Sequence, residues 1–167
     1  MAVETDRRSR NPMSWKYRRW GAERVYYLSR RLYLRGWHRL AYVLKFLNTY
    51  LFRAYIPPLV AIGQRLELPH GGFGVVMHED TVIGDDATIL HNVTIGNGGA
   101  RIGNRVYFGS GVTILGAVTI GDDVVIGAGA VVTFDVPTGS YVAGPKGRLF
   151  AGGNPNVAPP GSSAAAP

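Results

Sequence analysis

The stretch ATILHNVTIGNGGARIGNRVYFGSGVTILGAVTIGDDVVIGAGAVV, from Ala87 to Val132, repeats a large apolar residue at a fixed interval. Ile89 and Ile95 are six residues apart, and after one extra residue the interval of six resumes. The resumed series is Ile102, Phe108, Ile114, Ile120, Ile126 and Val132. Toward the N-terminus the pattern continues through Ile83, Met77, Leu68, Ile62 and Ile56, with one step of nine residues between Leu68 and Met77.

An interval of six fits neither an α-helix, with about 3.6 residues per turn, nor an isolated strand with alternating faces. It fits a coil with three short flat sides, each of which sends one large side chain toward the axis. Successive coils then pair as parallel strands, and glycine permits the tight corners. A β-sandwich with glycine turns is the alternative, but sandwich strands do not keep a six-residue phase. We therefore expect a mainly β chain that forms a parallel β-helix.

Positive charge is concentrated at the N-terminus, where residues 1–53 hold 13 of the 18 Lys and Arg but only 3 of the 11 acidic residues. Apolar residues recur there at helical spacings, at Val25, Leu28, Leu32, Leu40, Leu44 and Leu47. This pattern predicts a helix over residues 22–52 that covers the first coil as an amphipathic cap. Contact of this basic, aromatic segment with an anionic membrane is the alternative, and nucleic acid is not expected as a partner.

These patterns divide the chain into four regions. They are a basic, flexible N-terminus at 1–21, a helical cap at 22–55, the β-helix at 56–150 and a disordered tail at 151–167. The chain has no cysteine, which excludes disulfides and a cysteine nucleophile. Basic residues interrupt the apolar stretches near the N-terminus, so we expect no signal peptide or spanning helix. We expect a cytoplasmic protein, with peripheral contact at the inner face of the membrane left open.

Several motifs together resemble the hexapeptide-repeat acyltransferases over residues 20–150, and among them the short serine O-acetyltransferase-like proteins. They are Ile56-Pro57-Pro58, Leu68-Pro69-His70, Gly74-Val75-Val76, Asn92-Val93-Thr94-Ile95-Gly96, Ile120-Gly121-Asp122-Asp123-Val124 and Val131-Val132-Thr133-Phe134-Asp135-Val136-Pro137. The resemblance implies a left-handed β-helix and transfer of acetyl from acetyl-CoA to a hydroxyl of L-serine or a serine-like amino acid. Acetylation of a sugar or polysaccharide precursor, and a non-catalytic scaffold, are the alternatives.

The resemblance also implies a histidine general base that acts on the acceptor hydroxyl in a ternary complex. His70 occupies the matching position, although one extra residue separates it from the Gly-Val-Val stretch, and His91 is the second candidate. Arg101 is the cation nearest the shortened loop before the next coil, where it would bind an acceptor carboxylate. The closely spaced histidine pair of zinc-containing relatives is missing, so we expect no metal.

For acetyl-CoA the resemblance implies corners of small residues, along which the pantetheine arm would lie, followed by phosphate-binding cations. The matching residues are Gly109, Ser110, Gly111, Gly127, Ala128 and Gly129, then Lys146 and Arg148. The family further implies a homotrimer with active sites between subunits. The sequence ends without the terminal isoleucine by which related enzymes bind cysteine synthase, so we expect no complex of that type.

Overall fold

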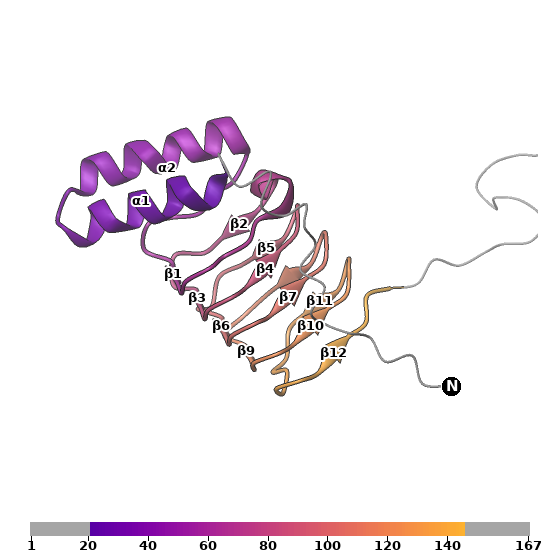
Figure 1. Ribbon diagram of the computed structural model, residues 1–167. Helices are drawn as coiled ribbons and strands as arrows, with labels where there is room; N and C mark the ends of the chain where they lie inside the picture. The colour runs from indigo at the N-terminus through magenta and orange to yellow at the C-terminus, as the bar shows by residue number, and fades with distance from the viewer. Residues whose placement is uncertain (1–20, 146–167) are drawn as a thin grey trace, which may run out of the picture.

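The computed structural model describes residues 21–145, so the predicted flexible N-terminus and disordered tail lie almost entirely outside the described range. Two helices, α1 (Ala22–Leu34) and α2 (His38–Phe52), lie over one end of a tapering stack of coils (Figure 1). The coils contain a short 3-10 helix, η1 (Pro69–Gly72), and twelve strands of two residues each. The strands are β1 (Ala61–Ile62), β2 (Val76–Met77), β3 (Val82–Ile83), β4 (Thr88–Ile89), β5 (Thr94–Ile95), β6 (Arg101–Ile102), β7 (Tyr107–Phe108), β8 (Thr113–Ile114), β9 (Thr119–Ile120), β10 (Val125–Ile126), β11 (Val131–Val132) and β12 (Tyr141–Val142).

The strands form three parallel sheets, one for each side of the coil. Their orders are β1-β3-β6-β9, β12-β10-β7-β4 and β11-β8-β5-β2. Each strand pairs with the strand three sides further along the chain, so every repeat residue stacks on its counterpart in the next coil. Ile83, for example, pairs with Ile102, which pairs with Ile120. The parallel β-helix with a helical cap predicted from the sequence is confirmed.

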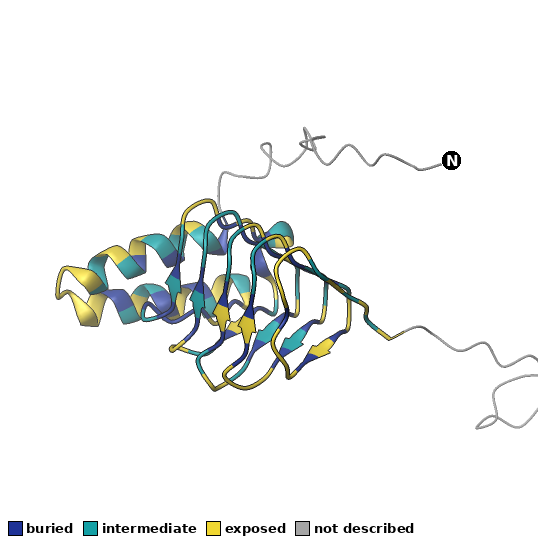
Figure 2. Cartoon of the chain, turned by 90° about the horizontal axis from the view of Figure 1, so that it is seen from below, coloured by how far each residue is buried: buried dark blue, intermediate teal, exposed yellow. Residues whose placement is uncertain are grey.

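The repeat residues form the core. All the aliphatic and aromatic residues at the six-residue interval from Ile56 to Val132 are buried, as are the smaller residues four positions later, such as Val93, Val112 and Val124. Figure 2 shows the resulting pattern, with buried residues lining the inside of each coil and exposed residues at its corners and outer faces. The outward residue of each strand is only partly covered, so one inward residue per side carries most of the packing.

Charged side chains order the corners that lead from the β1-β3-β6-β9 sheet into the β4-β7-β10-β12 sheet. Arg65 donates to Asp86 and Arg105 donates to Asp123, with Nη2–Oδ2 distances of 2.7 and 2.8 Å. The Arg65 guanidinium holds the pKa of Asp86 below its ordinary value. Beside these pairs, Asp122 Oδ1 accepts the Asn104 N–H at 2.7 Å, which lowers the pKa of Asp122. We call this column of corners the charged edge.

The cap is fastened to the first coil by side chains of α1. Tyr26 Oη donates to the Val60 carbonyl at 2.7 Å and accepts the Ile62 N–H at 3.2 Å. Arg30 Nη1 donates to the carbonyls of Pro58, Leu59 and Val60 at 3.0, 3.1 and 2.7 Å. The carbonyls that no strand uses at the open end of the solenoid are thus satisfied by the helix.

The helical cap predicted over residues 22–52 consists of two helices, because the chain breaks at Gly36. Gly36 has a φ of +84°, a left-handed conformation that glycine adopts without strain and that ends α1. The two helices then pack side by side, with Ser29 Oγ donating to the Ala41 carbonyl and Asn48 Nδ2 to the Ala22 carbonyl.

The apolar face predicted for the cap is wrong for α2. The buried residues of α2 are Ala41, Lys45 and Asn48, whereas Leu40 and Leu47 are exposed. Close approach of α2 to α1 favours small and hydrogen-bonding residues at the contact, so the large apolar residues of α2 point outward.

Replacement of a repeat residue should destabilise the fold far more than replacement of an outward residue. Ile114 is fully buried and Val131 is 59% exposed. Ile114→Ala removes packed methyl groups and should lower the free energy of unfolding by about 2–5 kcal/mol, against less than about 0.5 kcal/mol for Val131→Ala. Urea unfolding followed by circular dichroism measures both, and equal losses would contradict the assignment of the core.

Docking of the cap should weaken at high pH because Tyr26 must stay neutral. Burial raises the pKa of Tyr26 from 10.0 to about 12. Stability from this hydroxyl is therefore complete below pH 10 and is lost as the pH rises toward 12, by about 3 kcal/mol for a pKa difference of this size. Between pH 9 and 12 the free energy of unfolding should fall more steeply for the wild type than for Tyr26→Phe, which has no hydroxyl to ionise. Parallel curves would refute the role of Tyr26.

Candidate active site

The candidate residues converge on a second column of corners, which lead from the β4-β7-β10-β12 sheet into the β2-β5-β8-β11 sheet. Residues 69–74, 90–92, 109–111 and 127–129 form this column. Backbone hydrogen bonds connect successive corners, from the Gly111 N–H to the His91 carbonyl at 3.1 Å and from the Gly129 N–H to the Ser110 carbonyl at 2.9 Å. We call this column the histidine edge, because it begins with His70 and His91.

His70 lies in the longest corner of the column. It belongs to η1 and has a φ of +61°, followed by Gly71 and Gly72 at +72° and +77°. This left-handed run accommodates the extra residue noted in the sequence without moving His70 off the edge. The turn also contacts the cap, since a Cβ on Gly72 would lie 3.2 Å from the Ala22 Cβ of α1. A larger residue at position 72 would therefore push the His70 turn away from the helix.

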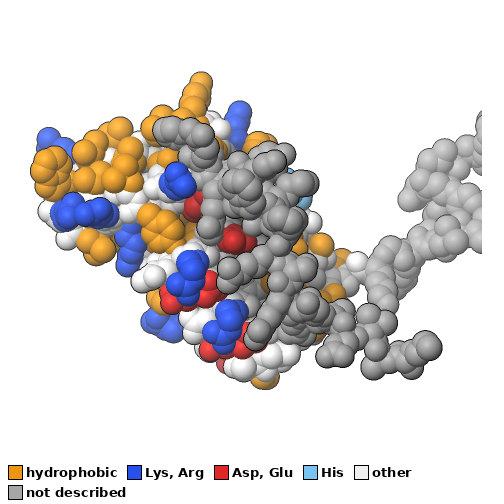
Figure 3. Space-filling view, in the orientation of Figure 1, with side chains coloured by type: hydrophobic (Ala, Val, Ile, Leu, Met, Phe, Trp, Pro, Cys, Tyr) orange, Lys and Arg blue, Asp and Glu red, His pale blue; other side chains and the backbone are white. Residues whose placement is uncertain are grey.

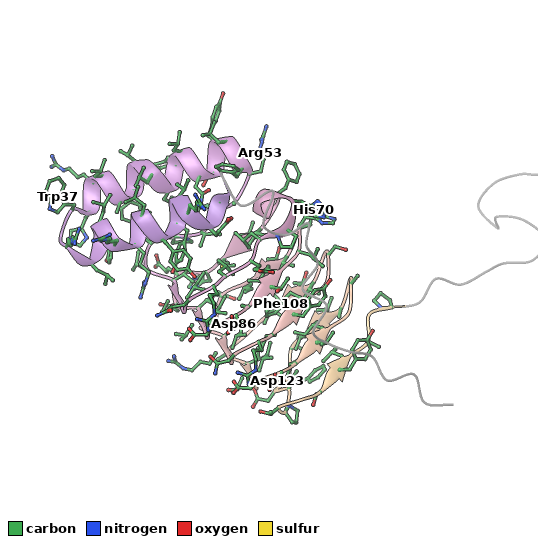
Figure 4. The ribbon with its side chains drawn as sticks, in the orientation of Figure 1. Trp37, Arg53, His70, Asp86, Phe108 and Asp123 are labelled. Carbon is green, nitrogen blue, oxygen red and sulfur yellow. The ribbon has the colours of Figure 1, made fainter. Side chains whose placement is uncertain are left out.

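His91 lies directly beside His70. Their ring centroids are 5.4 Å apart and the rings are nearly perpendicular, at 86°. His91 Nδ1 is buried and has no hydrogen-bond partner among residues 21–145. A buried polar nitrogen without a partner costs about 1–3 kcal/mol, which is a cost that a bound ligand can remove. Figure 4 shows His70 at the outer surface of the coils, close to the end of α2.

The small residues further along the edge have two different structural reasons. At Gly109 the next coil leaves no room, because a Cβ would lie 2.5 Å from the Ala128 nitrogen. Gly111 and Gly129 instead need a φ of +70°, and around a Cβ on Gly111 there is open space. Tight stacking explains Gly109 and the left-handed turn explains Gly111 and Gly129, and together these corners leave a surface poor in side chains below the two histidines.

Arg101 does not lie on the histidine edge. It is the outward residue of β6, on the β1-β3-β6-β9 sheet, and lines an open cleft of about 460 Å³ with Asp80, Gly98, Gly99 and Thr119. A second cleft, of about 410 Å³, lies between α1 and the first coil beside Arg30, Arg31 and Arg35. Neither cleft is lined by His70 or His91.

Arg53 is a cation near the histidine edge that sequence reasoning missed. It follows α2 with a φ of +56°, and its carbonyl accepts the Gly74 N–H at 3.1 Å, so its backbone lies against the His70 turn. Figure 4 shows it at the same end of the molecule as His70. The sequence signal was weak, because Arg53 reads as the last basic residue of the cap and only the stacking of coils places it next to residue 74.

Other predicted site residues cannot be placed or gain no support. Lys146 and Arg148 lie outside the described residues. Within residues 21–145 no group of three or more His, Cys, Asp or Glu is arranged to hold a metal ion. In the same range, no helix has both the length and the apolar composition needed to cross a membrane.

Comparison with known proteins identifies the family of this chain. The profile described as bacterial transferase hexapeptide (six repeats) matches residues 99–133. A serine acetyltransferase of Helicobacter pylori strain ATCC 700392 / 26695 is 43% identical over 132 residues, which cover 75% of this chain and 77% of that protein. This chain belongs to the serine acetyltransferase family. An Escherichia coli K12 protein that carries the name of a colanic acid biosynthesis acetyltransferase, WcaB, is 43% identical over 100 residues, or 56% of this chain and 61% of that protein.

Solved structures of serine acetyltransferases share the fold. One described as a complex with CoA matches with a TM-score of 0.70 and 31% identity, over 77% of this chain and 55% of that chain. The present chain thus spans little more than half the length of that serine acetyltransferase. The part it shares with this family comprises the cap and the β-helix.

Proposed function

We propose that the protein transfers the acetyl group of acetyl-CoA to the hydroxyl of L-serine. The H. pylori relative that supports this proposal is named as a serine acetyltransferase and aligns over three quarters of both chains. The observation that carries the proposal is the histidine edge, on which His70 and His91 stand at the head of a column of glycine corners. A base and a smooth binding surface are the two features that direct acyl transfer needs.

His70 acts as the general base in this proposal. It takes the proton of the serine hydroxyl as the oxygen attacks the thioester carbonyl carbon, and it returns that proton to the CoA sulfur as the C–S bond breaks. No acyl-enzyme is needed, which fits a chain without cysteine. His91 is the positioning residue, because its ring packs against the edge of His70 at 5.4 Å and restricts the orientation of the imidazole.

The CoA arm lies along the glycine corners in this proposal, with its backbone-like amides against Gly109–Gly111 and Gly127–Gly129. The CoA complex of a related enzyme supports CoA as the acyl carrier. Lys146 and Arg148 follow the last coil in sequence and are the proposed partners of the CoA phosphates.

A homotrimer would complete the site. Neither of the two clefts described above is lined by His70 or His91, and a ligand in direct transfer must be shielded from water on more than one side. A neighbouring copy packed against the histidine edge would supply that second wall, and Arg101 would contribute from that copy. Arg53 needs no neighbour and is the more direct candidate for the serine carboxylate.

A sugar hydroxyl is the second candidate acceptor, favoured by the relative named for colanic acid biosynthesis. That relative matches as closely in identity as the H. pylori enzyme but over a shorter stretch of the chain. A sugar without a carboxylate would form no ion pair with Arg53. The two acceptors therefore differ in whether they need this residue.

The acceptor is tested by release of free CoA from acetyl-CoA with purified protein. Each acceptor is supplied in a separate reaction. L-Serine should give turnover, and nucleotide sugars and homoserine are the alternative acceptors. His70→Ala should lower kcat by about 10²–10⁴ through loss of the general base, and His91→Ala should lower it less. Turnover with a sugar and not with serine would overturn the choice of acceptor, and full activity of His70→Ala would overturn the mechanism.

The CoA surface is tested by a pair of matched glycine variants. A Cβ at Gly109 would meet the Ala128 nitrogen at 2.5 Å on the histidine edge, and a Cβ at Gly103 would meet the Asp122 nitrogen at 2.8 Å on the charged edge. Both alanine variants crowd the next coil, so both should lose some stability. Only Gly109→Ala should raise the KM for acetyl-CoA, by roughly tenfold or more. An equal rise in Gly103→Ala would show a general loss of structure instead.

A further inference from the structure

The helix α2 presents its most apolar face to the outside of the molecule. Its exposed apolar residues are Leu40, Val43, Phe46, Leu47, Tyr50 and Leu51, with exposed fractions between 42% and 83%. At about 100° per residue they fall within an arc of about 140° on the helix. The face toward α1 holds Ala41, Lys45 and Asn48 instead. Nothing in the described part of the chain covers the outer face.

Exposed apolar residues continue around the end of the hairpin. Leu34 and Trp37, at the connection between the helices, are 69% and 63% exposed. Figure 3 shows hydrophobic side chains gathered over the helices at the end of the molecule away from β12, with Lys and Arg side chains among and around them. A cluster of exposed apolar side chains of this kind marks a site of contact with another surface.

The surroundings of this face carry one sign of charge. Residues 21–53 contain seven Lys and Arg and a single acid, Glu23. Arg31, Arg35, Arg39 and Arg53 are exposed. Arg39 lies in the first turn of α2, at the N-terminal end of this face, and Arg35 precedes Trp37 in the connection between the helices. Long basic side chains at the border of an apolar helix face are typical of helices that lie in the plane of a membrane interface.

Charge also decides between the surfaces that could cover this face. A second copy of the hairpin would bring the same positive charge against itself, and residues 1–20 add six basic residues against two acids. An anionic lipid surface supplies the opposite charge and an apolar layer beneath it. With 15 residues, α2 is too short to span a bilayer, which leaves a position parallel to its plane.

We propose that the outer face of α2, with Trp37 at its start, inserts into the headgroup region of an anionic lipid bilayer. In this arrangement Val43, Leu47 and Tyr50 enter the acyl boundary while the arginines meet lipid phosphates. The β-helix then projects from the membrane with its histidine edge accessible. The inference is independent of the acceptor, because it rests on the cap alone.

The test is co-sedimentation of the full chain with vesicles, without substrates. The protein should bind vesicles of mixed phosphatidylglycerol and phosphatidylcholine, bind pure phosphatidylcholine weakly, and be released from the anionic vesicles by high salt. The variant Val43→Glu/Leu47→Glu should bind anionic vesicles at least about tenfold less, because its charges would enter the acyl boundary. This variant retains the basic residues 1–20. If that segment alone bound the vesicles, the variant would bind as well as the wild type, and this result would refute the role of α2.

The matched control is Ala117→Glu/Thr119→Glu, which adds the same charge at exposed positions of the β-helix. It should bind like the wild type, and a comparable loss would show that net charge alone determines binding. Light scattering on the same proteins distinguishes a second copy as the covering surface. A wild-type assembly that Val43→Glu/Leu47→Glu reduces in size, with no binding to vesicles, would overturn the proposal. Unchanged circular dichroism verifies that the variants fold.

Discussion

Parallel stacking of identical positions is the constraint on which this structure depends. Each coil places one large apolar residue per side directly over its counterpart in the coil before, as Ile95 pairs with Ile114 in one sheet and Ile89 with Phe108 in another. Strands of only two residues could not hold a sheet by hydrogen bonds alone, so the inward ladder of side chains supplies the cohesion. Because the register is fixed at every side, the corners are also superimposed, and each corner becomes a column with a constant chemistry.

The charged edge and the histidine edge differ in their chemistry. The charged edge alternates Arg65, Asp86, Arg105 and Asp123, which neutralise one another within the protein. The histidine edge has no such pairing and instead combines two imidazoles with glycine corners. The extra residue between Ile95 and Ile102 falls on the remaining edge, between β5 and β6. An insertion at a corner leaves the inward ladder in phase, which is why the repeat resumes at Ile102 without loss of register.

The sequence predicted the solenoid well because its signal is periodic and local. An interval of six identifies inward residues without knowledge of any distant contact, and all of them are buried. Prediction of the cap failed for the opposite reason. Amphipathic spacing identifies an apolar stripe but not the surface that it faces, and in α2 the contact with α1 uses Ala41 and Asn48 while Leu47 is exposed. The break at Gly36 was likewise open to two readings, since a glycine is tolerated within a helix as well as at its end.

Placement of the site residues depended on the stacking. His70 and His91 are 21 residues apart, and their contact follows only once the longer first corner is known to remain on the same edge. Arg53 required the same information. The His70 turn belongs to the coil that Gly72 joins to Ala22 of the cap, whereas the glycine corners belong to coils further down the stack. The candidate base and the candidate cofactor surface are therefore supported by different parts of the molecule. A change in how the cap packs at Gly72 would therefore reach the His70 turn directly, and the glycine corners only through the coils between them.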